Sequence, residues 1–143
     1  MFIAVPRAVT IEDVAAMALA LPEAVEGERR GNLTWSVGDN AFAWERPFSK
    51  ADLLRFGEDT PPGGPIVAVR VADLGEKEAV LAESHPGFFT IPHFDGYPAI
   101  LIQLKSVRRA ALSDAVTDAW LVSAPARVAD EYLRRLRSVR PKS

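Results

Sequence analysis

The stretch LTWSVGDNAFAWE, residues 33–45, decides the fold that the sequence predicts. On each side of a Gly-Asp-Asn turn at residues 38–40, large apolar residues alternate with small or polar ones, which is the period of a half-buried strand. Two such strands with so short a connection predict a β-hairpin, and its strands must run antiparallel.

The aromatic residues of this hairpin, Trp35, Phe42 and Trp44, allow two interpretations. One is a stacking platform for single-stranded nucleic acid, which needs basic side chains beside the rings. Only Arg46 follows closely, and large aromatic residues dominate protein cores. We therefore interpret these three side chains as core.

Outward from the hairpin, capping signals and helical spacing predict helices. Thr10 with Asp13, Ser49 with Asp52, and Asp73 with Glu76 are the expected caps of three helices, the third with Leu74, Ala79, Val80 and Leu81 inward; a fourth is expected to open at Ser113 and a fifth after Pro125. The segment 47–65 is an ordered wing or a flexible loop, and its part EDTPPGGP, residues 58–65, predicts a loop.

Strands are expected at residues 66–71, 88–91 and 99–105, the last in a central place in the sheet because it is apolar throughout. The strand at 88–91 and the one at 99–105 could pair as a hairpin across the loop between them. The resulting fold class is α+β, a two-layer antiparallel β-sheet with helices packed on one face. At 143 residues we expect a single domain, 1–143, with a basic C-terminal tail at about 134–143.

Charge is spread unevenly along the chain. Residues 1–104 hold 8 basic and 15 acidic residues, whereas residues 105–143 hold 9 basic and 4 acidic ones, so a net charge of −2 conceals a basic end. Such asymmetry is typical of a surface for nucleic acid, although basic residues also favour helix C-termini and solvated chain ends. The predicted nucleic-acid contacts are Arg127, Arg134, Arg135, Arg137 and Arg140, or Arg29 and Arg30 before the hairpin.

Composition excludes several classes of site. The absence of cysteine removes disulfides, thiolate metal sites and cysteine nucleophiles. The start, MFIAVPRAV, does not have the pattern of a signal peptide, and apolar runs are short, so we expect a cytoplasmic protein without a membrane partner.

The sequence offers little for catalysis. His85 and His93 are the only histidines, and the pair His93 and Asp95 falls short of the three or four ligands that a metal site needs. No phosphate-binding glycine motif and no serine nucleophile motif is present. We therefore expect no catalytic, cofactor or metal residues, and a protein that is not an enzyme.

The stretch PHFDGYP, residues 92–98, followed by AILIQL resembles the MmcQ/YjbR-like family of small proteins. The resemblance covers about residues 10–135, with residues 47–65 poorly matched. It implies a YjbR/CyaY-like fold, related in shape to bacterial frataxin, and DNA binding, as members are described. The signature positions are Pro92, His93, Asp95, Gly96, Tyr97 and Pro98.

Two functional hypotheses follow. The first is a DNA-binding module, from the charge asymmetry and the resemblance. The second is a module that binds a protein or a small ligand through the 92–98 loop, because loops on a rigid scaffold often carry recognition. In the structural alternative, Asp95 hydrogen-bonds the loop backbone and Gly96 supplies a left-handed position.

Overall fold

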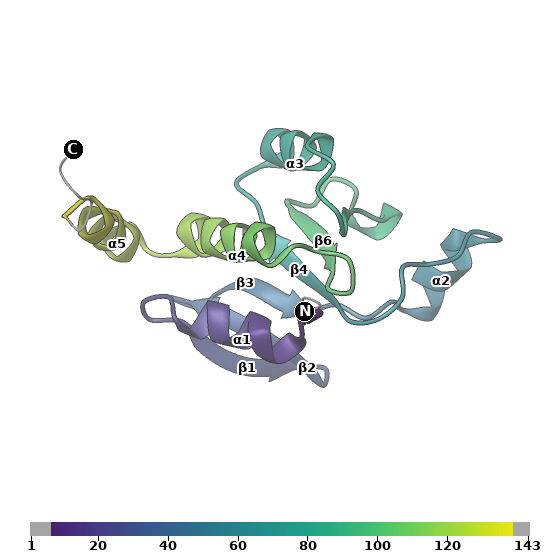
Figure 1. Ribbon diagram of the computed structural model, residues 1–143, viewed down its shortest axis with the longest axis horizontal. Coiled ribbons are helices and arrows are strands. Elements are labelled where there is room, and N and C mark those ends of the chain that lie inside the picture. Colours follow the sequence, from purple (N-terminus) through teal and green to yellow (C-terminus); the bar gives the residue numbers. More distant parts are fainter. Residues whose placement is uncertain (1–6, 139–143) are drawn as a thin grey trace, which may run out of the picture.

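The computed structural model describes residues 7–138 and shows an α+β fold, as predicted (Figure 1). One six-stranded sheet has the order β1-β2-β3-β4-β6-β5, and every neighbouring pair is antiparallel. The strands are β1 (Val25–Arg29), β2 (Asn32–Val37), β3 (Asn40–Glu45), β4 (Ile66–Arg70), β5 (Phe88–Phe89) and β6 (Ala99–Gln103). The helices are α1 (Ile11–Leu19), α2 (Lys50–Phe56), α3 (Leu74–Ala82), the short 3₁₀ helix η1 (Pro92–Phe94), α4 (Arg109–Ser123) and α5 (Ala126–Ser138).

The hairpin at residues 33–45 is confirmed as β2 and β3. Val37 pairs with Asn40, and the two residues between them, Gly38 and Asp39, have φ of 52° and 70°. Positive φ at both central residues is the turn geometry that matches the twist of a hairpin.

A bulge in β3 changes where the aromatic side chains point. Trp35 pairs with Ala43 but Ser36 pairs with Ala41, so Phe42 is an extra residue on its strand. Trp35 and Phe42 belong to the main core, as interpreted from the sequence. Trp44 does not: it lies half-buried on the opposite face of the sheet, against a second cluster.

The edge strand β1 was not predicted, because its sequence VEGER has no apolar alternation and all five residues are exposed. It pairs with β2 across Arg30 and Gly31, which both have positive φ. The indole Nε1 of Trp35 donates to the carboxylate of Glu26 at 2.9 Å, so the buried ring is held by an exposed strand.

The hairpin across the PHFDGYP loop is also confirmed. Phe88 pairs with Ile102 and Phe89 with Leu101, and β6 lies between β4 and β5 with four of its five residues buried. The segment 47–65 contains the capped helix α2, in which Ser49 accepts from the N–H of Asp52 and Asp52 accepts from the N–H of Ser49.

Two helix predictions need correction. Helix α4 begins at Arg109 rather than Ser113, because Leu112 is buried in its first turn and Arg109 Nη2 reaches Asp13 at 3.3 Å. In α3, Leu74 and Ala79 are exposed, and the buried residue of that helix is Lys77, whose amine finds backbone carbonyls to bind.

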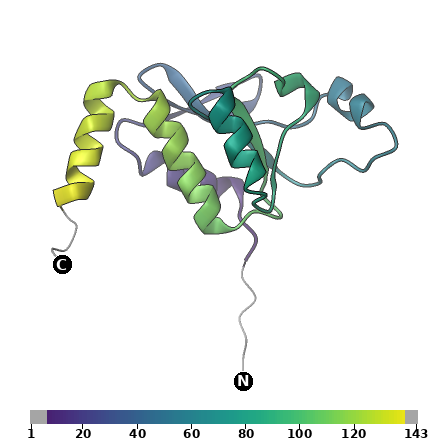
Figure 2. The ribbon, with the colours of Figure 1, turned by 90° about the horizontal axis from the view of Figure 1, so that it is seen from above.

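Cores form on both faces of the sheet. Helices α1, α3 and α4 cover one face (Figures 1 and 2), and its buried side chains include Trp35, Trp120 and Phe42. On the other face a smaller cluster joins Ala68 and Leu101 of the sheet to Ile91 and Phe94, with α2 packed at its edge. That face is otherwise open over β1 to β4, and it carries the candidate site.

Candidate nucleic-acid interface

A basic groove runs over the open face of the sheet. Its volume is about 740 Å³. We call it the basic groove. The residues that line it are Arg29, Arg30, Asn32, Thr34, Ala41, Trp44, Glu45, Arg46, Pro47, Ser49, Arg70, His93, Phe94 and Tyr97. Four of the lining residues are arginines, and one, Glu45, is acidic. The carboxylate of Glu45 already accepts a hydrogen bond from the N–H of Leu33 at 2.7 Å.

The register of the sheet brings these residues to one face. Thr34 pairs with Trp44, Trp44 pairs with Ala68, and residues directly opposite each other in a sheet share a face. Arg70 lies two residues after Ala68 on β4, and side chains two apart on a strand share a face. The groove is therefore built by four strands and the loop at residues 92–98.

Arg70 lies against two aromatic rings. Its guanidinium carbon is 4.9 Å from the centre of the Tyr97 ring and 5.6 Å from that of the Trp44 ring. The two rings meet edge to face, with centres 6.5 Å apart. The cation and the two rings thus form one half-buried cluster in the lining of the groove.

Arg46 is held by Asp52 at the base of α2. Its Nη2 lies 2.9 Å from the Asp52 carboxylate, which is 1% exposed. Burial raises the pKa of this carboxyl, but the hydrogen bonds from Ser49 and Arg46 outweigh burial, so the pKa lies below its usual value. Arg46 is therefore a structural cation that also faces Phe94, at 5.5 Å from the ring centre.

Arg29 and Arg30 differ from Arg46 in being fully at the surface. Both are exposed at the turn between β1 and β2 and line one end of the groove. Neither Arg29 nor Arg30 takes part in any of the ion pairs within residues 7–138. They are available to bind an anion.

The signature loop divides between structure and groove. His93 and Tyr97 line the groove, and Gly96 has the left-handed φ of 74° that was expected there. Pro92 opens η1, and the carbonyl of Pro98 accepts from the N–H of Val71 at 3.0 Å.

The buried amine of Lys77 fixes this loop from the side of α3. It donates to the carbonyl of Phe94 and, at 2.9 Å, to that of Tyr97. Burial lowers the pKa of Lys77, and the nearby charge of Asp95 opposes that shift. Within residues 7–138 the Asp95 carboxylate takes part in no side-chain hydrogen bond, which differs from the backbone hydrogen bond expected from the sequence.

The arginines of α5 lie elsewhere. Helix α5 and the 92–98 loop are toward opposite ends of the molecule in both ribbon views (Figures 1 and 2). Arg127 pairs with Glu23 at 3.6 Å and Arg135 with Glu131 at 2.9 Å. Arg134 and Arg137 are exposed on the same helix, and the predicted contact Arg140 is outside the described residues.

Sequence reasoning missed Arg70 as a groove residue, and it assigned Trp44 to the core after weighing it, with Arg46, as part of a stacking platform. The bulge that turns Trp44 has no signature in the sequence, and the 23 residues between Arg46 and Arg70 hide that β3 and β4 are neighbours. The sequence feature that could have indicated Arg70 is its charge at the end of the otherwise apolar strand IVAVR.

Two further observations limit the chemistry. Within residues 7–138, no group of three or more histidine or acidic residues is placed to hold a metal ion. In the same part of the chain, no helix is both long and apolar enough to cross a membrane.

Comparison with known proteins places the chain in a family. It is 42% identical over 127 residues to three uncharacterized mycobacterial proteins, Rv2570 and MT2646 of two Mycobacterium tuberculosis strains (ATCC 25618 / H37Rv and CDC 1551 / Oshkosh) and Mb2600 of Mycobacterium bovis; the match covers 87% of this chain and 95% of each relative. The chain belongs to the family that these proteins form. No family model matches it.

Proposed function

We propose that this chain is a binding protein, not an enzyme, and that it binds single-stranded DNA in the basic groove. The observation that carries the proposal is that Arg29, Arg30 and Arg70 gather with two half-buried aromatic rings on one open sheet face. Proteins that bind single strands combine a positive groove for the backbone with aromatic side chains on which bases stack.

The groove divides these tasks between its parts. Arg29 and Arg30, exposed at one end, would neutralise phosphates. Trp44 and Tyr97 would offer ring surface to bases, and Arg70, whose guanidinium packs on both rings, would help to hold them in place. Arg46 is already neutralised by Asp52 and contributes less to the attraction.

Two sequence features support the same function. The resemblance of residues 92–98 to the MmcQ/YjbR-like family agrees with DNA binding, as members of that family are described, and we propose membership in it. The sequence expectation of a cytoplasmic location also suits a DNA ligand. We therefore propose that the contacts lie on the sheet face rather than on α5.

The test is a fluorescence anisotropy titration of a labelled oligothymidylate at low and moderate salt. The variant Arg29→Gln/Arg30→Gln removes two exposed groove cations, and Arg127→Gln/Arg134→Gln removes two exposed cations from α5. We expect the groove pair to weaken binding at least tenfold and the α5 pair to leave binding near that of the wild type, because charge counts only where it meets phosphate.

Two results would contradict the proposal. One is the absence of wild-type binding at low salt, where phosphate contacts are strongest. The other is a loss of binding in the α5 pair with none in the groove pair, which would move the contacts to the helix that the charge pattern indicated.

A small anionic ligand is the second candidate, and it is favoured by the size of the groove. A volume of about 740 Å³ is in the range of small-molecule sites, and the 92–98 loop supplies His93, Phe94 and Tyr97 to it. A nucleoside triphosphate that displaces the oligothymidylate far better than free phosphate would favour this ligand class over a strand.

A further inference from the structure

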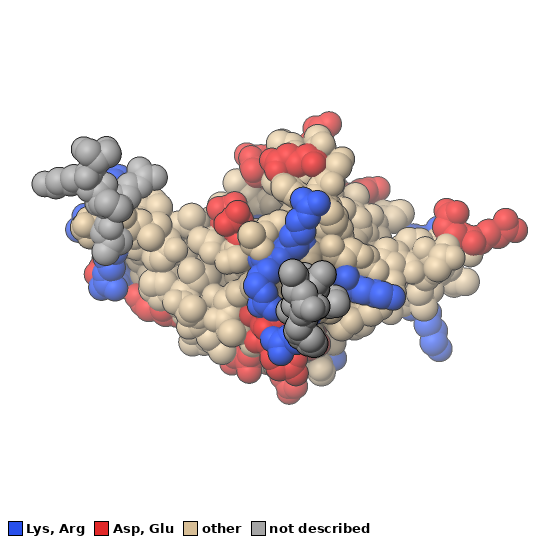
Figure 3. Space-filling model, viewed as in Figure 1, with Lys and Arg blue, Asp and Glu red and all other residues tan. Residues whose placement is uncertain are grey.

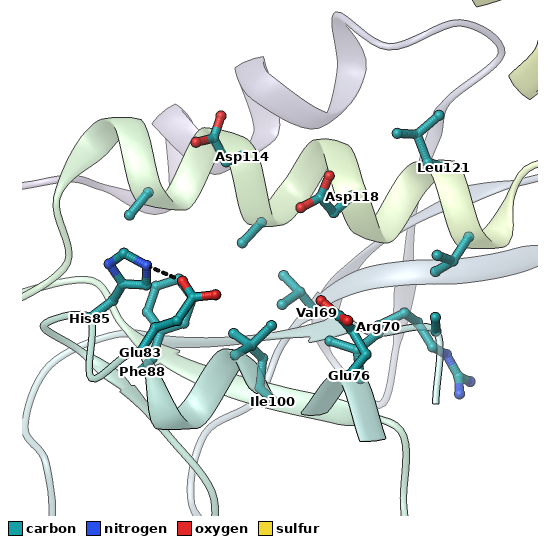
Figure 4. A pocket seen from close by; sticks show the side chains of 16 residues that line it. Val69, Arg70, Glu76, Glu83, His85, Phe88, Ile100, Asp114, Asp118 and Leu121 are labelled. Atoms are coloured by element: carbon teal, nitrogen blue, oxygen red, sulfur yellow. Dashed lines mark hydrogen bonds and ion pairs between the residues drawn. The ribbon is translucent and has the colours of Figure 1, made fainter. Parts of the chain in front are cut away.

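A second hollow lies on the opposite face of the sheet, between α3 and α4 (Figure 4). Its volume is about 470 Å³. The floor is apolar, with Val69, Ile100 and Phe88 from three strands and Leu121 from α4. We call this hollow the acidic groove because of its rim.

The rim carries four acidic side chains, Glu76 and Glu83 from the α3 side and Asp114 and Asp118 from α4. Glu83 is paired with His85 at 2.7 Å. The other three make no ion pair with the residues that the structure describes. Arg70 borders the hollow, but Figure 4 shows its side chain directed away from the acids.

Repulsion between these acidic side chains contributes to a raised pKa at Asp118. Partial burial raises the pKa of Asp118, and the charges of Asp114 and Glu76 raise it further. A cation placed between α3 and α4 would relieve this repulsion. The acidic groove thus suits a ligand that is both cationic and apolar.

Helix α5 of this chain has that character. Its first half is anchored to the body by buried Val128 and by Tyr132, whose ring centre is 5.0 Å from that of Trp120. Its second half continues the apolar stripe with Leu133 and Leu136, which are 39% and 47% exposed. By helical spacing, Arg135 and Arg137 flank this stripe.

We propose that the acidic groove binds the second half of α5 from a second copy of this chain. Leu133 and Leu136 would cover the apolar floor, and Arg135 and Arg137 would meet the acidic rim. Figure 3 shows acidic side chains gathered over α3, whereas the basic residues Arg135 and Arg137 lie in the last turn of α5, away from α3. Amphipathic helices commonly bind in apolar grooves in this way.

A second copy is the occupant because the same chain cannot supply the helix. Helix α5 lies at the end of the molecule away from α3 (Figures 1 and 2). Folding it back over its own groove would pull Tyr132 from Trp120. If each copy gives its α5 to the other, the contacts close in a two-fold dimer.

The experiment is sedimentation equilibrium on the full chain over a wide range of concentration. We expect the wild type to form a dimer that weakens with salt, as charged interfaces do. Variant Arg135→Glu/Arg137→Glu makes the helix acidic, and variant Asp114→Arg/Asp118→Arg makes the groove basic. Each alone should be monomeric, and an equimolar mixture of the two should dimerise again, because each helix then meets a groove of opposite charge.

The recovery in the mixture is a readout that a misfolded variant cannot give. Arg127→Glu/Arg134→Glu, the same charge change placed off the apolar stripe, is the matched control and should dimerise like the wild type. If charge reversal harms the fold by circular dichroism, Leu133→Ser/Leu136→Ser tests the same contact and should be monomeric. A wild type that stays monomeric at every concentration, or dimers that survive both charge reversals, would overturn the proposal.

Discussion

The guanidinium carbon of Arg70 lies 4.9 Å from the centre of the Tyr97 ring. This contact joins the last residue of β4 to the loop at residues 92–98, and Trp44 of β3 completes it at 5.6 Å from the same carbon. The signature loop and the sheet therefore form one surface. Through His93, Phe94 and Tyr97, the 92–98 loop forms part of the lining of the basic groove.

Replacement of Arg70 by lysine is expected to weaken oligothymidylate binding about fivefold, or about 1 kcal/mol. Lysine keeps the charge but loses the planar group that packs on Trp44 and Tyr97. Arg29→Lys is the matched control, because Arg29 is exposed and supplies charge alone. Anisotropy titrations measure both, and equal losses in the two variants would contradict the role assigned to the cluster.

Lys77→Ala is expected to destabilise the protein by about 1–3 kcal/mol, because the carbonyls of Phe94 and Tyr97 lose their buried donor. Glu78→Ala on the exposed side of α3 should change the free energy of unfolding by less than about 0.5 kcal/mol. Denaturant unfolding measures both values. A neutral Lys77→Ala would mean that α3 does not hold the loop.

We expect the ionised carboxylate of Asp13 to stabilise the fold and this contribution to be lost in acid. The N–H of Thr10, above all, and Arg109 lower its pKa from 3.8 to about 2. A folded-state pKa below the unfolded one adds stability that is complete above pH 3.8 and disappears as the pH falls through about 2. Asp13→Asn should therefore melt below the wild type at pH 7, and the difference in Tm should shrink toward pH 2; a difference independent of pH would contradict this assignment.

Gly87→Ala is expected to be far more damaging than Gly31→Ala. Both glycines have positive φ, 87° and 81°, which costs a non-glycine residue about 1 kcal/mol. Only at Gly87 would the added Cβ meet backbone, 2.7 Å from the carbonyl oxygen of Gln103, and such overpacking adds about 1–3 kcal/mol. Thermal unfolding of the two variants compares them, and equal losses would show that β5 tolerates displacement.

Local patterns were sufficient to predict most of the fold. The hairpin at residues 33–45, the caps at Thr10, Ser49 and Asp73, and the pairing of β5 with β6 depend on neighbours in sequence. The failures depend on tertiary contacts. β1 forms only because β2 offers an edge to pair with, and α4 starts early because Leu112 is needed in the core.

The candidate site was harder to predict than the fold. Arg29, Arg30, His93 and Tyr97 were named from the sequence, but nothing local shows that they share a groove. Trp44 could be placed beside these residues only once the bulge at Phe42 was known. Arg70 could be placed there only once the order of the strands was known. The basic end of the chain drew attention to α5, which the structure separates from this face.

The most direct test of the basic groove is the tryptophan fluorescence of the protein during titration with unlabelled oligothymidylate. Trp35 and Trp120 are fully buried, so Trp44 is the only tryptophan that a base can reach. We predict that the wild type is quenched on binding and that Trp44→Phe shows no change at protein saturation. An unchanged wild-type spectrum when anisotropy reports full binding, or equal quenching in Trp44→Phe, would contradict binding in this groove.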